Sequence, residues 1–139
     1  MKAELQGDWQ ARLIAHARDA REHAHAPYSH YKVGAAVLAG SGRIYGGCNI
    51  EYATYTLTRH AEMTAFEKAI SEGERDFLAL AVITDDKSAP FPCALCRQVM
   101  AEHCAPAFVV IGANMEGAIR KTTLAGLYPH CFGPRNLEA

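Results

Sequence analysis

The segment FVVIGANMEGAIRKT, residues 108–122, decides how the last part of the sheet is connected. Its first four residues form an apolar run typical of a buried strand, and residues 119–122 are predicted to form the next strand. Only the seven residues 112–118 separate the two. Because a parallel crossover needs a dozen or more residues, we expect these strands to pair antiparallel.

Upstream of this segment, the pattern predicts three more strands and three helices. KVGAAVLAG at 32–40 is closed by the turn GSG, which makes 43–50 its hairpin partner, and 78–84 is a further buried strand. Helices are expected from Asp8 to the residues before Pro27, from 59 to 71 and from 93 to 104, with Asp8 and Thr58 as N-caps of the first two. This alternation predicts an α/β fold, a three-layer α/β/α sandwich around a mixed five-stranded sheet, and leaves the strand order open.

Composition limits the classes of function. The chain has 139 residues, half of them hydrophobic, which predicts a single domain over 1–139. Its 14 basic and 15 acidic residues leave a formal charge of −1, so we expect no nucleic-acid partner. No apolar stretch approaches the roughly 20 residues of a membrane helix, and the first residues do not resemble a signal peptide. Five cysteines, an odd number, argue against a disulfide framework, and we expect a cytoplasmic protein.

Two short motifs carry the chemistry: HAE at 60–62 and PCALC at 92–96. Cys93 follows His60 by 33 positions, which leaves room for a helix, a strand and a loop and predicts both motifs at helix N-termini on the same end of the sheet. Cys93 and Cys96 then share one helix face, where the helix dipole favours thiolates. We predict that His60, Cys93 and Cys96 bind Zn²⁺ and leave a fourth position for water.

Glu62 follows the predicted histidine ligand by two residues. Zinc lowers the pKa of bound water to roughly 7, and a nearby carboxylate that does not bind the metal is suited to move the protons. We therefore predict Glu62 as the catalytic acid–base. The combined H-x-E and P-C-x-x-C pattern is typical of zinc-dependent nucleobase deaminases.

Three simpler interpretations compete with an open zinc site. A redox C-x-x-C pair is disfavoured because no tryptophan directly precedes it, as one does in thioredoxin-like motifs, and because HAE would go unexplained. A closed structural zinc site would need His103 or Cys104 as fourth ligand, two turns farther along the same helix, which makes convergence on one ion awkward. Core cysteines beside an unrelated His-Glu pair would require three features to coincide.

Four blocks in order resemble the cytidine deaminase family, small homotetrameric type, along almost the whole chain. They are APYSHYKVGAA at 26–36, GCNIE at 47–51, HAE with PCALCRQ at 92–98, and LYPHCFGPRNL at 127–137. The resemblance implies that family's fold, one zinc per subunit, a homotetramer with sites shared between subunits, and a small cytosine nucleoside as substrate.

The resemblance also implies a set of substrate-binding residues. Asn49 and Glu51 would hydrogen-bond the ribose. Residues two apart on an extended segment point to one side, and an amide with a carboxylate suits a hydroxyl that both donates and accepts. The Ala61 N–H would meet the base carbonyl, Tyr31 would pack on the pyrimidine, and Phe132 would reach into a neighbouring subunit's site.

One departure from the family concerns the first zinc ligand. Tetrameric relatives usually have Cys-Ala-Glu-Arg where this chain has His60-Ala61-Glu62-Met63. Three thiolates give the zinc site one net negative charge, which that arginine can offset, whereas an imidazole and two thiolates give a neutral site. We therefore expect His60 and Met63 to have changed together, with no compensating cation at position 63.

The expected activity is zinc-dependent hydrolytic deamination of cytidine and 2′-deoxycytidine to the uridine products, with release of ammonia. Two alternatives stay open. Tyr31, Tyr52 and Thr56 are bulky or polar departures that favour a modified cytosine nucleoside or an antibiotic of the blasticidin S type. A protein of another class, a non-catalytic zinc-stabilised binding protein, would hold the metal and show no turnover.

Overall fold

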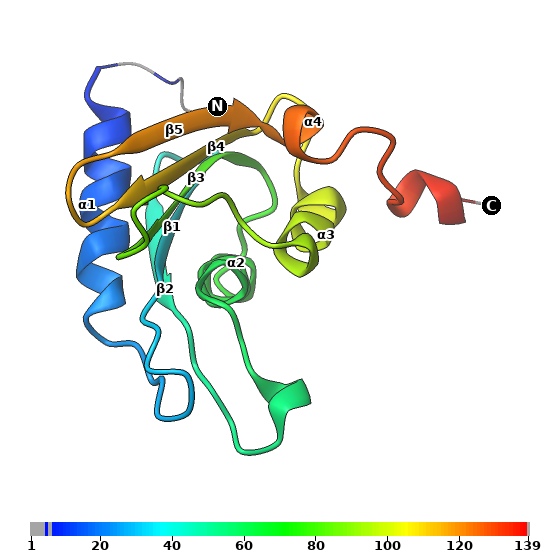
Figure 1. The fold of residues 1–139 in the computed structure, drawn as a ribbon. Helices are drawn as coiled ribbons and strands as arrows, with labels where there is room; N and C mark the ends of the chain where they lie inside the picture. Colours follow the sequence, from blue (N-terminus) through cyan, green and yellow to red (C-terminus); the bar gives the residue numbers. More distant parts are fainter. Residues whose placement is uncertain (1–4, 6, 139) are drawn as a thin grey trace.

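One mixed sheet forms the centre of the computed structural model, which describes residue 5 and residues 7–138 (Figure 1). Its five strands lie in the order β2-β1-β3-β4-β5, and only β3 and β4 are parallel. The strands are β1 (Gly34–Ala39), β2 (Ile44–Cys48), β3 (Phe77–Thr84), β4 (Val109–Asn114) and β5 (Ile119–Thr123). The predicted mixed sheet and its antiparallel last pair are confirmed.

The length of each connection explains this topology. The chain passes from β3 to the parallel β4 through α3 (Ala94–His103), a crossover long enough to reverse direction twice. It passes from β4 to β5 through a four-residue turn at 115–118. Here the Asn114 Oδ1 accepts from the N–H groups of Glu116 and Ala118, at 3.0 and 2.8 Å, and Gly117 adopts a φ of +95°.

Helices cover both faces of the sheet, as the three-layer prediction required. α1 (Trp9–Arg21) lies on one face, and α2 (Ala61–Ser71) lies with α3 on the other (Figure 1). Short helical segments connect these elements or follow them: η1 (Tyr55–Leu57), α4 (Leu124–Leu127) and η2 (Pro134–Leu137). No helix within the described residues is long and apolar enough to span a membrane.

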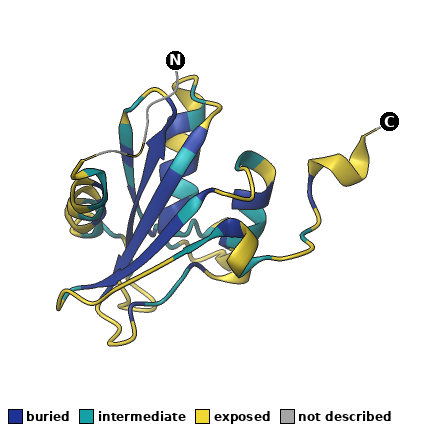
Figure 2. Cartoon of the chain, turned by 90° about the horizontal axis from the view of Figure 1, so that it is seen from above, coloured by how far each residue is buried: buried dark blue, intermediate teal, exposed yellow. Residues whose placement is uncertain are grey.

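The central strands are buried on both sides, and Figure 2 shows them almost uniformly dark blue. Successive residues of β1 alternate between two cores. Val37 and Ala39 join the cluster under α2 and α3, whereas Ala36 and Leu38 join the cluster under α1. The apolar run predicted as a strand is therefore continuous because neither face meets water.

Two glycines allow the helix layers to approach the sheet. A Cβ on Gly34 would lie 2.0 Å from the carbonyl oxygen of Ala17 in α1. A Cβ on Gly47 would lie 2.5 Å from the backbone nitrogen of Ala65 in α2. The second approach places the start of α2, and with it the HAE motif, directly beside β2.

Two predicted helix ends were wrong. The second helix begins at Ala61 with His60 at its N-cap, not at 59 after Thr58, because the Thr58 N–H closes the preceding η1 turn on the Tyr55 carbonyl. The first helix ends at Arg21, well before Pro27, because His25 leaves the helix path and pairs with Ile50. Asp8 lies at the N-cap of α1, but its side chain makes no capping hydrogen bond.

Candidate metal centre and adjoining pocket

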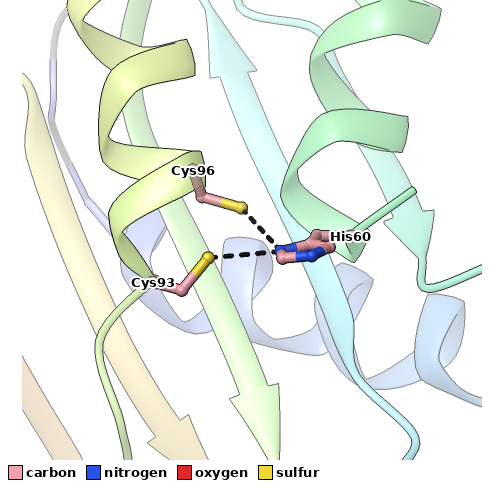
Figure 3. Close-up of side chains that lie close together, drawn as sticks. All are labelled: His60, Cys93 and Cys96. Atoms are coloured by element: carbon pink, nitrogen blue, oxygen red, sulfur yellow. Dashed lines mark hydrogen bonds between the residues drawn. The ribbon is translucent and has the colours of Figure 1, made fainter. Parts of the chain in front are cut away.

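The starts of α2 and α3 meet at one end of the sheet, as the motif spacing predicted. His60 lies at the N-cap of α2 and Cys93 at the N-cap of α3, with Cys96 one turn into that helix. The His60 Nδ1 lies 3.2 Å from the Cys93 Sγ and 3.4 Å from the Cys96 Sγ (Figure 3). The donor atoms of all three residues lie within 4.8 Å of one another. This spacing suits one small ion.

Burial and charge at these residues favour a cation. Cys96 is fully buried, and burial, together with the negative charge of nearby Glu62, raises the pKa of its thiol. Burial lowers the pKa of His60, which keeps its imidazole in the neutral form that binds metals. A bound divalent cation would instead lower the pKa of both thiols, because a thiol that coordinates a metal is deprotonated. Two sulfurs and one imidazole nitrogen are a donor set that suits Zn²⁺.

The group has three protein donors. Among the described residues, no fourth His, Cys, Asp or Glu joins it. His103 and Cys104 lie at the far end of α3, where the His103 ring stacks on Phe66 at 6.1 Å and Cys104 is the C-cap. The arrangement favours an open catalytic site over a closed structural one.

Glu62 lies in the first turn of α2 and is 4% exposed. Burial raises the pKa of its carboxyl, and hydrogen bonds from its own N–H and from the Cys96 thiol oppose that shift. A raised pKa makes a carboxyl group a stronger base and favours proton uptake, as a catalytic acid–base requires. Glu62 is not among the three grouped donors, and its role as the catalytic acid–base stays a prediction.

A cavity of about 330 Å³ opens beside this group. Its volume is at the lower end of the range typical of small-molecule sites. It is lined by the predicted residues Tyr31, Asn49, Glu51, His60, Ala61, Glu62 and Cys93. The structure therefore places two of the metal donors, His60 and Cys93, and the predicted substrate residues around one pocket.

Phe132 is not part of this pocket in its own chain. It is 55% exposed, and its backbone carbonyl accepts a hydrogen bond of 2.9 Å from the Gln98 side chain. The prediction for Phe132 concerned a neighbouring subunit's site, so it stays a prediction.

Asn49 and Glu51 also bind the loop that precedes β1. The Asn49 amide accepts from the Val33 N–H at 2.9 Å and donates to the Tyr31 carbonyl at 2.7 Å. The Glu51 Oε1 accepts from the N–H groups of Tyr28 and Ser29, at 3.1 and 3.0 Å. The two polar residues thus form one wall of the pocket and hold its neighbouring wall in place.

Several pocket residues were missed by the sequence analysis. Phe91 lines the cavity directly before the PCALC motif, and the Arg120 guanidinium lies 4.3 Å from the centre of its ring. An aromatic residue adjoining a metal motif was the available signal. Thr84 lines the cavity from the end of β3, and Ser29 from the loop; both are common residue types without a distinguishing pattern. Tyr52 and Thr56 line a second, adjoining cavity of about 580 Å³. Four residues line both cavities: Ser29, Glu51, Thr58 and His60.

The fold and the site together define a class. A buried glutamate beside a His-Cys-Cys donor group, at two helix N-termini, is the arrangement of zinc-dependent deaminases that act on nucleobases. The sequence profile of one family, described as the zinc-binding region of cytidine and deoxycytidylate deaminases, matches residues 7–112. The chain belongs to this cytidine and deoxycytidylate deaminase family.

Individual relatives agree with this assignment. A cytidine deaminase of Sporosarcina psychrophila is 49% identical over 127 residues, which cover 91% of this chain and 93% of the relative. The crystal structure of cytidine deaminase from Burkholderia pseudomallei is similar with a TM-score of 0.85 and 43% identity, over 88% of this chain and 98% of that one. Cytidine deaminase from Mycobacterium tuberculosis is similar with a TM-score of 0.78 and 36% identity, over 93% of this chain and the whole of that one.

Proposed function

We propose that this protein hydrolyses cytidine and 2′-deoxycytidine to uridine and 2′-deoxyuridine and releases ammonia. One observation carries the proposal: the buried Glu62 carboxylate adjoins both the three-donor group and a nucleoside-sized cavity. Two relatives that this chain matches over most of their length are named cytidine deaminases, which supports the same substrate class.

The metal and the carboxylate have separate tasks. A zinc ion held by His60, Cys93 and Cys96 would acidify water beside the pocket. Glu62 takes a proton from that water and delivers it to the ring nitrogen N3 of the cytosine, which makes C4 electrophilic. A C4–O bond forms. Glu62 then moves the proton of the new C4 hydroxyl to the amino group, and the C4–N bond breaks as the C4=O bond forms. Cytidine and one water thereby give uridine and one ammonia.

The remaining pocket residues hold the nucleoside. The Ala61 N–H is in the first turn of α2, where N–H groups lack partners within the helix, and we assign it to the base carbonyl. Tyr31, 40% exposed, packs on the pyrimidine, and Asn49 and Glu51 bind the sugar.

The proposal extends to the assembly and location of the protein. We propose one domain over residues 1–139 that works as a cytoplasmic homotetramer, with Phe132 of one subunit completing a neighbour's site. In support, Phe132 lies exposed on the C-terminal segment, which extends away from the sheet in Figure 1, and all five cysteines are free. We expect no nucleic-acid partner, since the formal charge is only −1, and no membrane partner, since no apolar stretch approaches the roughly 20 residues of a membrane helix.

The direct test is a substrate panel on protein whose zinc content has been measured. Ultraviolet assays would compare cytidine, deoxycytidine, free cytosine, 5-methylcytidine and blasticidin S. We expect turnover of the first two. Turnover confined to blasticidin S would mean that the substrate is that antibiotic and not cytidine. Stoichiometric zinc without any turnover would indicate a binding protein.

Glu62→Gln tests the mechanism. A carboxamide does not act as a general acid or base near neutral pH. The variant should therefore retain zinc and lose activity by the roughly 10²–10⁴-fold that general acid–base catalysis contributes, or by more. Unimpaired turnover by zinc-loaded Glu62→Gln would refute the role of the carboxylate.

A further inference from the structure

The Ser29 side chain lies between the loop before β1 and the predicted sugar-binding carboxylate. Its hydroxyl donates a short hydrogen bond to the Glu51 Oε2, and its backbone N–H donates to Oε1 at 3.0 Å. One serine therefore holds both oxygens of Glu51. Ser29 also lines the cavity beside the metal donors, so this contact is at the substrate pocket.

The backbone of Tyr31 fixes the direction of that hydroxyl. The Tyr31 N–H donates to the Ser29 Oγ at 3.0 Å, so the single hydroxyl proton of Ser29 is left to point at Glu51. The Tyr31 carbonyl in turn accepts from the Asn49 amide at 2.7 Å. Both polar residues assigned to the sugar are therefore tied to the same short loop.

Counting acceptor positions shows what Glu51 has left for a ligand. A carboxylate offers about four lone-pair positions. Tyr28 and Ser29 N–H groups occupy two on Oε1, and the Ser29 hydroxyl occupies one on Oε2. With the contacts of the described residues counted, one acceptor position remains, on the oxygen whose orientation the Ser29 hydroxyl sets.

We propose that Ser29 is a positioning residue for sugar recognition: its hydroxyl orients Glu51 so that the remaining lone pair accepts a hydrogen bond from a sugar hydroxyl of the nucleoside. The inference rests on the proposed deamination of a cytosine nucleoside. It assigns the selectivity for hydroxylated sugars to a residue that does not itself bind the reacting base.

The experiment measures kcat and KM of Ser29→Ala for cytidine and for 2′,3′-dideoxycytidine, which lacks both ring hydroxyls. Loss of a hydrogen bond to a charged group predicts a roughly 10- to 100-fold fall in kcat/KM for cytidine, expressed mainly in KM. For dideoxycytidine the change should stay within about 3-fold, since no sugar hydroxyl meets Glu51. Ser29→Thr retains the hydroxyl and should remain near the wild type for both.

The chain offers a matched control at the opposite end of the sheet. The Ser41 hydroxyl donates to Glu74 at 2.7 Å and accepts from the Arg43 N–H at 3.3 Å, the same pattern away from the pocket. Ser41→Ala should leave both substrates unaffected.

The outcomes separate the two proposals. If zinc-loaded wild type turns over neither nucleoside, the proposed function fails. If wild type is active but Ser29→Ala lowers kcat/KM equally for both nucleosides, or acts on kcat alone, the positioning role of Ser29 is wrong and the function stands.

Discussion

The pocket has two halves that are built in different ways. On the metal side, Cys96 and Glu62 lie in the first turns of two helices that pack on the sheet, and they are 0% and 4% exposed. On the sugar side, Tyr31, Ser29 and Glu51 lie on loops open to solvent and are held by side-chain hydrogen bonds. Buried polar groups are costly to disturb, whereas exposed ones exchange readily with water. We therefore expect changes on the metal side to have the larger effects.

The largest effect is predicted for Cys96→Ser. Changes to residues that only support metal ligands cost about 10–100-fold in affinity or activity, and loss of a buried ligand should exceed this. The measurements are zinc content and cytidine turnover. Cys104→Ser, at the far end of the same helix, is the control and should retain both.

An active, zinc-loaded Cys96→Ser enzyme would contradict the metal assignment. If Cys104→Ser lowered zinc content and turnover as much as Cys96→Ser, the loss would not be specific to the metal ligand. The larger effect could then not be assigned to the metal side of the pocket.

A second metal-side prediction concerns charge. His60→Cys would give three thiolates and an excess negative charge, and no arginine or lysine of the described residues donates a hydrogen bond to either existing sulfur. Met63 lies three residues on, on the same side of α2 as His60, and both line the larger cavity. We expect His60→Cys to reduce kcat by about 10–100-fold and added Met63→Arg to recover part of it.

Kinetics with measured zinc content would test this prediction, with Met63→Arg alone as the control. If the double variant is no better than His60→Cys, the pairing of histidine with methionine has no electrostatic cause.

The metal side followed from the sequence because its geometry is local. Cys93 and Cys96 share one helix turn, and a helix N-terminus is the expected place for a thiolate. Placing His60 beside them required only that two helices start at the same sheet edge. The exact start of α2 was predicted incorrectly because the η1 turn competes for Thr58, a contact that residue spacing does not reveal.

The sugar side did not follow in the same way. Asn49 and Glu51 came from family resemblance, and their hydrogen bonds to the 28–33 loop bring together residues 16 to 23 positions apart. Ser29 has no sequence pattern that marks it, because its importance depends on the position of Tyr31 and Glu51 in space. Strand order was likewise beyond the sequence, since several orders satisfy the same connection lengths.

The smallest effect is predicted on the sugar side, for the pH dependence of stability in Glu51→Gln. The Ser29 hydroxyl, followed by the Ser29 and Tyr28 N–H groups and the charge of His30, holds the pKa of Glu51 below its ordinary value. A lowered pKa in the folded state means that the ionised carboxylate stabilises the fold. This contribution is fully present above the ordinary pKa of about 4.3 and is lost as the pH falls through the folded-state pKa.

Thermal unfolding of wild type and Glu51→Gln from neutral to acidic pH should therefore show a small difference in Tm that shrinks as the pH falls. Glu74→Gln is the matched control, because hydroxyls of Ser41 and Tyr45 lower the pKa of Glu74 in the same manner. Both variants should show the same pH trend in stability, and only Glu51→Gln should raise KM for cytidine. A Tm difference that grows toward acidic pH would contradict the lowered pKa. A KM increase in both variants would mean that loss of any surface carboxylate weakens binding. The assignment of Glu51 to sugar binding would then be wrong.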